Sequence, residues 1–230
     1  MNAIIALETA TSSCSAALRI NGEIVERSQV GSNVHSQVLL SMVQELLASA
    51  AISPKQLDAV AVGQGPGSFT GLRIGVGVGQ GLAYGSGCPM IGVSSLMALA
   101  HAAPNNGLVL AGIDARMGEI YWGEYLKDGA ALKQLAPLQV SAPSVLSNQL
   151  MSGDEGSRQL VGNAWPEYWD KFEVAFQQSN TLCKSTVFPS AANLLALAEQ
   201  KYLRQEVESA IEFQPIYVRN DVAKKSTKKF

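Results

Sequence analysis

The most constraining feature of this sequence is a long central stretch that is almost without charge. Across the 55 residues from Ala59 to Ile113, the only charged side chain is Arg73. Charged residues normally make up about a quarter of a globular chain, so this stretch is either buried on several sides or in contact with a partner. It holds ten glycines between Gly63 and Gly87, and no window of about 20 residues is uniformly apolar. We therefore expect no membrane span.

Composition and termini narrow the class of protein further. The chain has 230 residues, 47% of them hydrophobic, which is enough for one large domain or two small ones without disulfides or metals. Its three cysteines show no C-x-x-C spacing and fit reduced core thiols. The first residues lack a basic segment and a long apolar run, so no signal peptide is predicted and we expect a cytoplasmic protein.

The charges are distributed unevenly between the body and the C-terminal end. Four lysines lie in the last seven residues, and residues 1–223 carry 13 basic and 19 acidic side chains, a net charge of −6. A protein that grips nucleic acid by itself normally shows a basic patch. Only the Lys-rich tail, residues 221–230, could serve that purpose here, and such tails are commonly solvated.

The first half of the chain predicts a three-stranded meander followed by alternating helices and strands. Residues 3–9, 14–20 and 23–30 read as strands, and Asn21-Gly22 is typical of a type I′ hairpin turn. Residues 35–51 have helical periodicity, with Ser32 or Asn33 as the expected N-cap. Strands at 57–62 and 90–93 flank a glycine-rich loop and a helix at 70–84, and another helix begins at Ser94 or Ser95.

The second half repeats this opening. A strand at 108–113 ends at Asp114, a strand follows at 119–126, and Asp128-Gly129 marks a hairpin; helices at 143–151 and 190–204 flank a strand at 159–162. The repeat predicts an α/β fold of two ribonuclease-H-like lobes, as in the actin-like ATPase (ASKHA) superfamily, the second lobe diverged and smaller. We expect lobes at residues 1–104 and 105–220, followed by the tail.

Two helices carry unusual surfaces. The apolar arc of the 35–51 helix is wide, since Leu39 and Val43 fill one face while Leu40 and Leu47 extend to the next. The 70–84 helix carries glycines at positions 71, 75 and 79, and each interior glycine costs about 1 kcal/mol relative to alanine. This helix needs close packing, either within the chain or against a partner.

Candidate chemistry is sparse. The glycine loop at 63–71 lacks the lysine of a phosphate-binding Walker A motif, so it is either an anion site or a tight turn. Glu8 and Asp114 end equivalent strands, and they either converge across a cleft to hold a metal–phosphate or bind turn amides. His35 and His101 lack zinc-site spacing, and no serine-hydrolase elbow surrounds Ser68.

Four segments resemble the TsaB (YeaZ) family: residues 7–10, 114–122 and 215–220, and above all the run Gly-Pro-Gly-Ser-Phe-Thr-Gly-Leu-Arg at 65–73. The resemblance implies a non-catalytic subunit in the synthesis of N6-threonylcarbamoyladenosine in tRNA, on the adenosine 3′ of the anticodon. It implies pairing with the paralogous transferase TsaD, docking of the ATPase TsaE on the pair, a homodimer when TsaD is absent, and contact with tRNA only through the complex.

The resemblance also implies site residues. The vestigial nucleotide or phosphate cleft would contain Glu8, Thr9, Gly65, Pro66, Gly67, Ser68 and Asp114, with no cofactor beyond possible weak nucleotide binding. TsaD binds its metal through H-H-x-x-x-H, and Ser95 and Leu99 occupy those ligand positions here, so no metal is expected. An M22-type metallopeptidase is therefore a distant alternative, and an ATP-binding enzyme of the actin-like or sugar-kinase type is the nearer one.

The family's partner surface is built from its first two helices, which match 35–51 and 70–84 here. The resemblance points to a partner interface at these helices, and a place in the ordinary core is the alternative for each residue. The interface would consist of Leu40, Val43, Leu47, Arg73, Val76, Gln80 and Tyr84.

Overall fold

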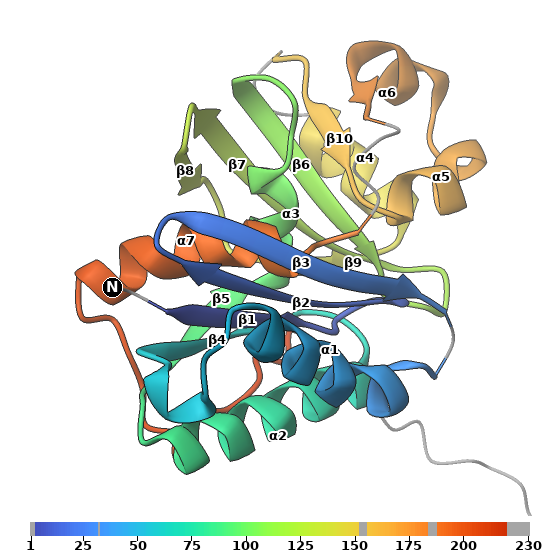
Figure 1. Ribbon diagram of the computed structural model, residues 1–230. Coiled ribbons are helices and arrows are strands. Elements are labelled where there is room, and N and C mark those ends of the chain that lie inside the picture. Colours follow the sequence, from blue (N-terminus) through green and yellow to red (C-terminus); the bar gives the residue numbers. More distant parts are fainter. Residues whose placement is uncertain (1–2, 32, 152–155, 184–187, 220–230) are drawn as a thin grey trace, which may run out of the picture.

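The computed structural model describes residues 3–31, 33–151, 156–183 and 188–219, and it contains two sheets with helices around them (Figure 1). The first sheet has the strand order β3-β2-β1-β4-β5. Its strands are β1 (Ile4–Glu8), β2 (Ser13–Ile20), β3 (Glu23–Val30), β4 (Ala59–Gly65) and β5 (Met90–Ser94). β1 pairs antiparallel with β2 and parallel with β4, and β5 continues the parallel half.

The second sheet repeats this arrangement with the order β11-β10-β6-β7-β8. Its strands are β6 (Gly107–Asp114), β7 (Ile120–Asp128), β8 (Ala131–Gln134), β10 (Gln159–Val161) and β11 (Thr181–Leu182), and the short β9 (Gln139–Ser141) pairs with β7. Like β1, β6 is antiparallel to the next strand and parallel to the strand that returns beside it. The same topology in both halves confirms the predicted pair of ribonuclease-H-like lobes.

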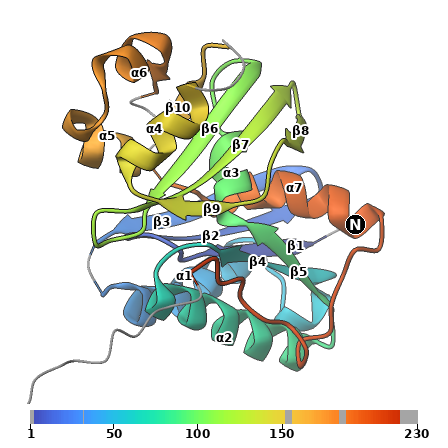
Figure 2. The ribbon, with the colours of Figure 1, turned by 180° about the vertical axis from the view of Figure 1, so that it is seen from behind.

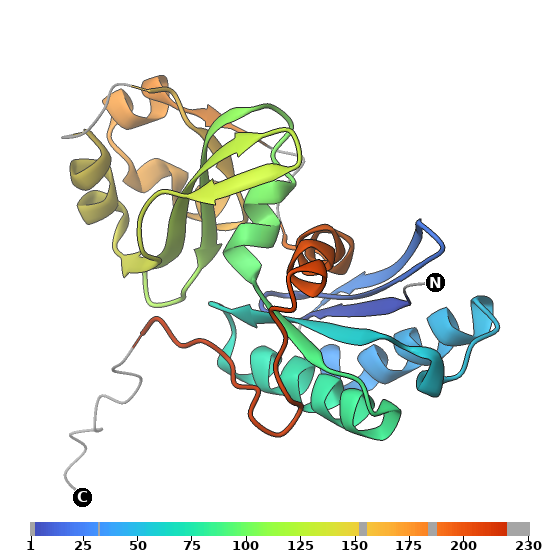
Figure 3. The same ribbon diagram turned by 90° about the vertical axis from the view of Figure 1, so that its left-hand side faces the viewer.

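Helices cover both faces of the first sheet. α1 (His35–Ser49) and α2 (Phe69–Ser86) lie on the outer face, next to the short 3₁₀ turn η1 (Pro54–Gln56). α3 (Ser95–His101) and α7 (Ala191–Leu203) lie on the inner face, between the two sheets (Figure 3). Leu99 of α3 packs with Val109 and Ala111 of the second sheet, so α3 joins the lobes through a shared apolar core.

The second lobe is closed by short elements around an aromatic core. They are α4 (Pro143–Met151), α5 (Ala164–Tyr168), η2 (Trp169–Lys171) and α6 (Val174–Ser179). The rings of Trp165, Phe172 and Phe176 pack in sequence, with centroid separations of 5.8 and 4.6 Å. Of these elements only α4 was predicted as such, because segments of three to six residues carry too few positions for a periodicity to emerge.

The C-terminal part of the chain returns to the first lobe, which corrects the predicted domain limits. Leu194 and Leu195 of α7 pack on Ile4 of the first sheet, and Phe213 is buried in the core beneath α1 and α2. The inner face of the first sheet is apolar and needs a cover, which the sequentially distant α7 supplies. Residues 190–217 therefore belong with the first lobe rather than with 105–189, and the predicted tail lies outside the described residues.

Turns and caps follow the sequence with one exception. Asn21 and Gly22 both have positive φ, at 53° and 87°, as a type I′ turn requires. Ser94 accepts a hydrogen bond from the Met97 amide and caps α3. The prediction that Ser32 or Asn33 caps α1 is wrong, because the N-cap is Val34 and it makes no side-chain cap hydrogen bond. Asn33 precedes it at φ 58°. Ser32 lies outside the described residues. Within the described ranges, no helix is long and apolar enough to cross a membrane.

Candidate functional site

A cleft of about 510 Å³ lies between the lobes. The first lobe contributes the turn after β1, the first turn of α1 with His35, and residues 67–71, which comprise the end of the glycine loop and the start of α2. The second lobe contributes Asp114, Arg116, Tyr121 and Asn163, and Arg219 reaches the cleft from the C-terminal segment. The cleft lies between the lobes as expected, but only part of the predicted set lines it. Gly67, Ser68 and Asp114 do, whereas Glu8, Thr9, Gly65 and Pro66 do not.

The glycine loop between β4 and α2 is a tight turn fixed against the end of β1. The Ser68 amide donates to the Ala10 carbonyl at 2.7 Å, and Ser68 Oγ accepts from the Gly71 amide at 3.2 Å. A Cβ at Gly67 would lie 2.3 Å from the Ala10 carbonyl oxygen, so only glycine fits there. Gly65 has φ 98° and precedes the cis peptide bond to Pro66. The tight-turn interpretation is confirmed, and the loop also presents the first turn of α2 to the cleft.

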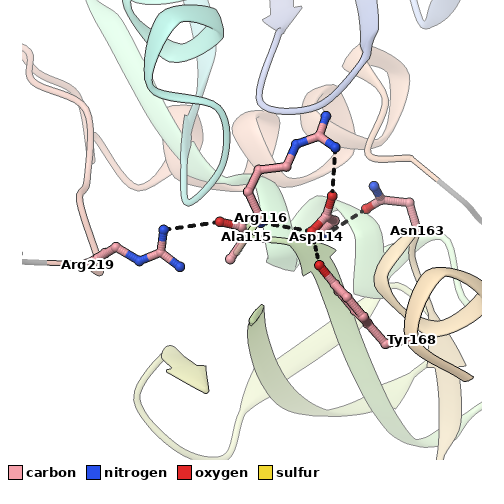
Figure 4. A network of polar contacts seen from close by, with 6 residues as sticks. All are labelled: Asp114, Ala115, Arg116, Asn163, Tyr168 and Arg219. Carbon is pink, nitrogen blue, oxygen red and sulfur yellow. Dashed lines mark hydrogen bonds and ion pairs between the residues drawn. The ribbon is translucent and has the colours of Figure 1, made fainter. Parts of the chain in front are cut away.

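Asp114 is held on the second-lobe wall by three neighbours (Figure 4). Tyr168 donates to Asp114 Oδ1 at 2.7 Å, the Arg116 amide donates to the same oxygen at 2.8 Å, and the Arg116 guanidinium pairs with Oδ2 at 3.1 Å. Asn163 accepts a hydrogen bond from the Asp114 amide. Burial raises the pKa of Tyr168 to about 12, and the hydrogen bond to the Asp114 carboxylate and the negative charge of that carboxylate act in the same direction. Tyr168 therefore remains a neutral donor.

The two arginines of the cleft differ in how they are held. Arg116 has a side chain that is 83% exposed and adopts φ 61° in the turn that begins after β6. Arg219 donates to the Ala115 carbonyl at 3.1 Å and pairs with Glu119, and both of these partners belong to the second lobe. Arg219 therefore ties the C-terminal segment to the second lobe, whereas the Arg116 side chain is exposed and pairs with Asp114, whose side chain is only 8% exposed.

Glu8 does not line the cleft, which contradicts the expectation that it converges with Asp114. Its side chain is fully buried, Oε1 accepts from the Ala10 amide at 2.7 Å, and Oε2 accepts from Ser95 Oγ at 2.8 Å. Burial raises the pKa of Glu8, and these hydrogen bonds oppose that rise. Glu8 thus bonds a turn amide, the alternative that the sequence had left open. Thr9 is fully buried as well, beneath α2.

The positions that would hold a metal in TsaD do not fit one here. Ser95 Oγ is engaged by Glu8, and Leu99 is fully buried in apolar packing between the lobes. A hydroxyl that donates to a carboxylate and an aliphatic side chain are not ligands for a transition metal. Over the described residues, no group of three His, Cys, Asp or Glu side chains could hold a metal ion.

The glycines of α2 form two stripes with opposite surroundings. A Cβ at Gly71 or Gly75 would meet Thr9 atoms at 2.1 and 2.3 Å, and one at Gly79 would lie 2.5 Å from Val62 Cγ2. This stripe serves packing within the chain. The second stripe is Gly77, Gly81 and Gly85. A Cβ at any of these three positions would meet no atom within 4 Å from the described residues beyond its own helix backbone, so this stripe faces outward.

The predicted interface residues divide between the core and the surface. Val43, Leu47 and Val76 are 2%, 6% and 5% exposed, so they are core residues rather than surface residues. Helical periodicity gave the correct arc but not which part of it faces the sheet. Leu40 and Tyr84 are 56% and 74% exposed and remain candidates for a partner surface.

The remaining two predicted residues bind a segment whose role the sequence did not reveal. Residues 205–219, named here the C-terminal strap, run along α2 toward the cleft (Figure 2). Gln80 donates to the carbonyls of Ala210 and Phe213, and Arg73 donates to the Tyr217 hydroxyl. The strap lacks secondary structure of its own apart from one bridge to β5, through Met90 and Glu208. Its sequence therefore has no periodicity from which its path could be predicted.

Comparisons with known proteins agree with this architecture. The family model for TsaD, tRNA N6-adenosine threonylcarbamoyltransferase, matches residues 28–227. The chain is 36% identical to the tRNA threonylcarbamoyladenosine biosynthesis protein TsaB of Haemophilus influenzae, covering 95% of this chain and 94% of that protein. It is 37% identical to the Escherichia coli protein of the same name, covering 96% of each.

A solved structure gives the same result. YeaZ from Pseudomonas aeruginosa superposes with a TM-score of 0.84 at 34% identity, over 94% of this chain and all of that one. Near-complete coverage in both directions means that the likeness spans both lobes rather than a single one. The chain therefore belongs to the TsaB (YeaZ) family, within the wider family described by the TsaD model.

Proposed function

We propose that this chain is a non-catalytic scaffold subunit that binds and activates a paralogous TsaD transferase. The reaction it supports is threonylcarbamoyl transfer to N6 of the tRNA adenosine 3′ of the anticodon, as the names of its relatives suggest. In this proposal the ATPase TsaE docks on the pair, the chain forms a homodimer when TsaD is absent, and tRNA is contacted only within the complex.

The observation that carries the non-catalytic role is the hydrogen bond between Ser95 and Glu8. Phosphoryl-transfer sites hold Mg²⁺ through carboxylates that face the bound phosphates. Here Glu8 is fully buried behind Ser95, and the carboxylate of Asp114 is already occupied by Tyr168 and Arg116. The fold of an ATPase is kept while its carboxylates serve packing and orientation, which favours a scaffold over an enzyme.

The outer face of α1 and α2 is the proposed docking surface. Leu40 and Tyr84 expose large apolar groups there, while Gly77, Gly81 and Gly85 leave the backbone of α2 uncovered. The distance between packed helices is set by the side chains at their contact. A partner helix can therefore approach α2 closely along this stripe, with Leu40 and Tyr84 supplying the buried apolar area.

Charge substitutions on this surface test the proposal. Leu40→Asp and Tyr84→Asp are expected to weaken TsaD binding at least about tenfold, since each places a charge in an apolar contact, and to reduce tRNA modification in a reconstituted system. Leu203→Asp, 67% exposed at the end of α7, is the matched control. All three variants should unfold at the wild-type temperature. Wild-type TsaD affinity in both surface variants would overturn the assignment.

An ATP-binding enzyme is the second candidate, favoured by the size of the cleft and by the helix start and arginine that line it. We propose no more than weak nucleotide binding. Titration calorimetry with ATP·Mg²⁺ tests this, because tight binding that is lost in Arg116→Ala would favour the enzyme. A metallopeptidase has no support from Ser95 and Leu99, and metal analysis of the purified protein checks it independently.

A further inference from the structure

Two aromatic rings lie exposed beside the mouth of the cleft. Phe69 begins α2 and Tyr217 belongs to the strap, and their ring centroids are 5.6 Å apart with the planes inclined by 39°. Phe69 is 44% exposed and Tyr217 is 43% exposed. Phe side chains are usually buried and Tyr side chains are often partly so, and a pair of rings exposed side by side is a candidate contact surface.

Arg73 fixes the two rings in place. Its guanidinium carbon lies 3.5 Å from the Phe69 ring centroid, and its Nε donates to the Tyr217 hydroxyl at 3.3 Å. Arg73, Phe69 and Tyr217 thus form a small preassembled stack. A ligand that adds to it does not have to order these side chains on binding, which lowers the entropic cost of association.

Three arginines lie in or beside this stack, in a protein whose body is acidic: Arg73 contacts both rings, and Arg116 and Arg219 line the neighbouring cleft. Arg116 and Arg219 line the cleft together with Phe69, and a smaller adjoining pocket is lined by Phe69, Tyr217 and Arg219. The carboxylates nearby, Asp114 and Glu119, are paired with those two arginines. The sequence then continues from the strap into a tail with four lysines, whereas residues 1–223 carry a net charge of −6.

We propose that Phe69, Tyr217 and Arg116 form an RNA-contact surface, on which unpaired bases stack against the rings and Arg116 bonds a phosphate. Aromatic and arginine planes are the usual partners of splayed-out RNA bases. The Arg116 side chain is 83% exposed and its guanidinium carries five N–H donors, so it can bond a phosphate while it stays paired with Asp114. The inference rests on the proposed function, since the RNA is the tRNA held by the complex. The guanidinium of Arg73 between the rings and the exposed Arg116 side chain favour RNA over a protein segment as the occupant.

The experiment uses the full chain in complex with TsaD and fluorescently labelled tRNA, with anisotropy measured over a range of salt concentrations. Phe69→Ala and Tyr217→Ala are expected to weaken tRNA binding about tenfold each, and Tyr217→Phe should bind normally because it keeps the ring. Arg116→Ala should reduce the salt dependence by about one phosphate contact. Leu126→Ala, 43% exposed on β7, is the matched control.

The outcomes separate the two proposals. If the alanine variants bind TsaD normally and bind tRNA as tightly as wild type, the RNA surface is overturned and the scaffold role stands. If they lose TsaD affinity instead of tRNA affinity, the surface is a protein interface and the inference is also overturned. If the wild-type chain does not bind TsaD, the proposed function fails and the inference falls with it.

Discussion

Ser95 Oγ donates a 2.8 Å hydrogen bond to Glu8 Oε2, and this contact seals a carboxylate inside the first lobe. Glu8 ends β1 and Ser95 begins α3, so the bond joins two elements 87 residues apart. Gly63 makes the space for it, because a Cβ there would lie 2.3 Å from Glu8 Oε2. The strand-end acid that an actin-like ATPase would direct toward its cleft is here part of the core.

Replacing this carboxylate by an amide should change how stability depends on pH. Burial raises the pKa of Glu8 above its ordinary value of 4.5. The folded state therefore favours the protonated form, and the contribution of Glu8 to stability is lost as pH rises through the folded pKa. We expect Glu8→Gln to be as stable as wild type near pH 4.5 and more stable at pH 7, by thermal unfolding monitored with circular dichroism. A stability gap that stays constant with pH would contradict this.

The two glycine stripes of α2 should respond oppositely to alanine. Gly79→Ala is expected to destabilise the chain by about 1–3 kcal/mol, because the new methyl group would overlap Val62. Gly81→Ala is the matched control on the outer stripe and should stabilise the isolated chain by up to about 1 kcal/mol, since it only improves helix propensity. Urea unfolding of both variants measures the difference. Equal effects at the two positions would refute the inward and outward assignment.

Arg219 should control how firmly the strap is attached to the second lobe. Arg219→Gln removes the ion pair with Glu119 and weakens the bond to the Ala115 carbonyl. We expect faster amide hydrogen exchange in residues 115–119 and in the strap, with a loss of about 1 kcal/mol of local stability. Arg204→Gln is the control, because its closest acidic contact is an exposed one at 3.9 Å. Unchanged hydrogen exchange at residues 115–119 would show that the Arg219 contacts do not stabilise the attachment of the strap to the second lobe.

The three cysteines should react at different rates with a thiol reagent. Cys14 is buried, and burial, with a smaller effect of the Glu8 charge, raises the pKa of its thiol to about 11. Cys88 and Cys183 are partly exposed. In the native protein Cys14 should stay unmodified at pH 8 while the other two react, and all three should react in denaturant. Native labelling of Cys14, mapped by mass spectrometry, would contradict its burial.

Local sequence signals accounted for most of the elements that form the lobes. The Asn21-Gly22 turn, the limits of β3 and the start of α3 follow from turn and cap chemistry that acts over a few residues. The duplicated strand order could also be inferred, because each lobe opens with a strand ending in an acid, followed by a second strand and a glycine hairpin. These features depend on neighbours along the chain.

The direction of each helix face and the path of the C-terminus could not be inferred this way. Leu40 and Leu47 both belong to one apolar arc, yet Leu40 is exposed and Leu47 is buried, because the sheet fixes the rotation of α1 about its axis. Likewise, only the folded chain shows that the outward stripe on α2 is Gly77, Gly81 and Gly85.

The family and the fold class could thus be inferred from residue types and their spacing. The folded chain was needed to show that Glu8 bonds Ser95, that Arg219 lines the cleft and that Tyr217 lines the smaller pocket beside it. Those contacts join residues about 100 positions apart, and which distant groups meet is set by how the lobes and α7 pack, information that no local pattern contains.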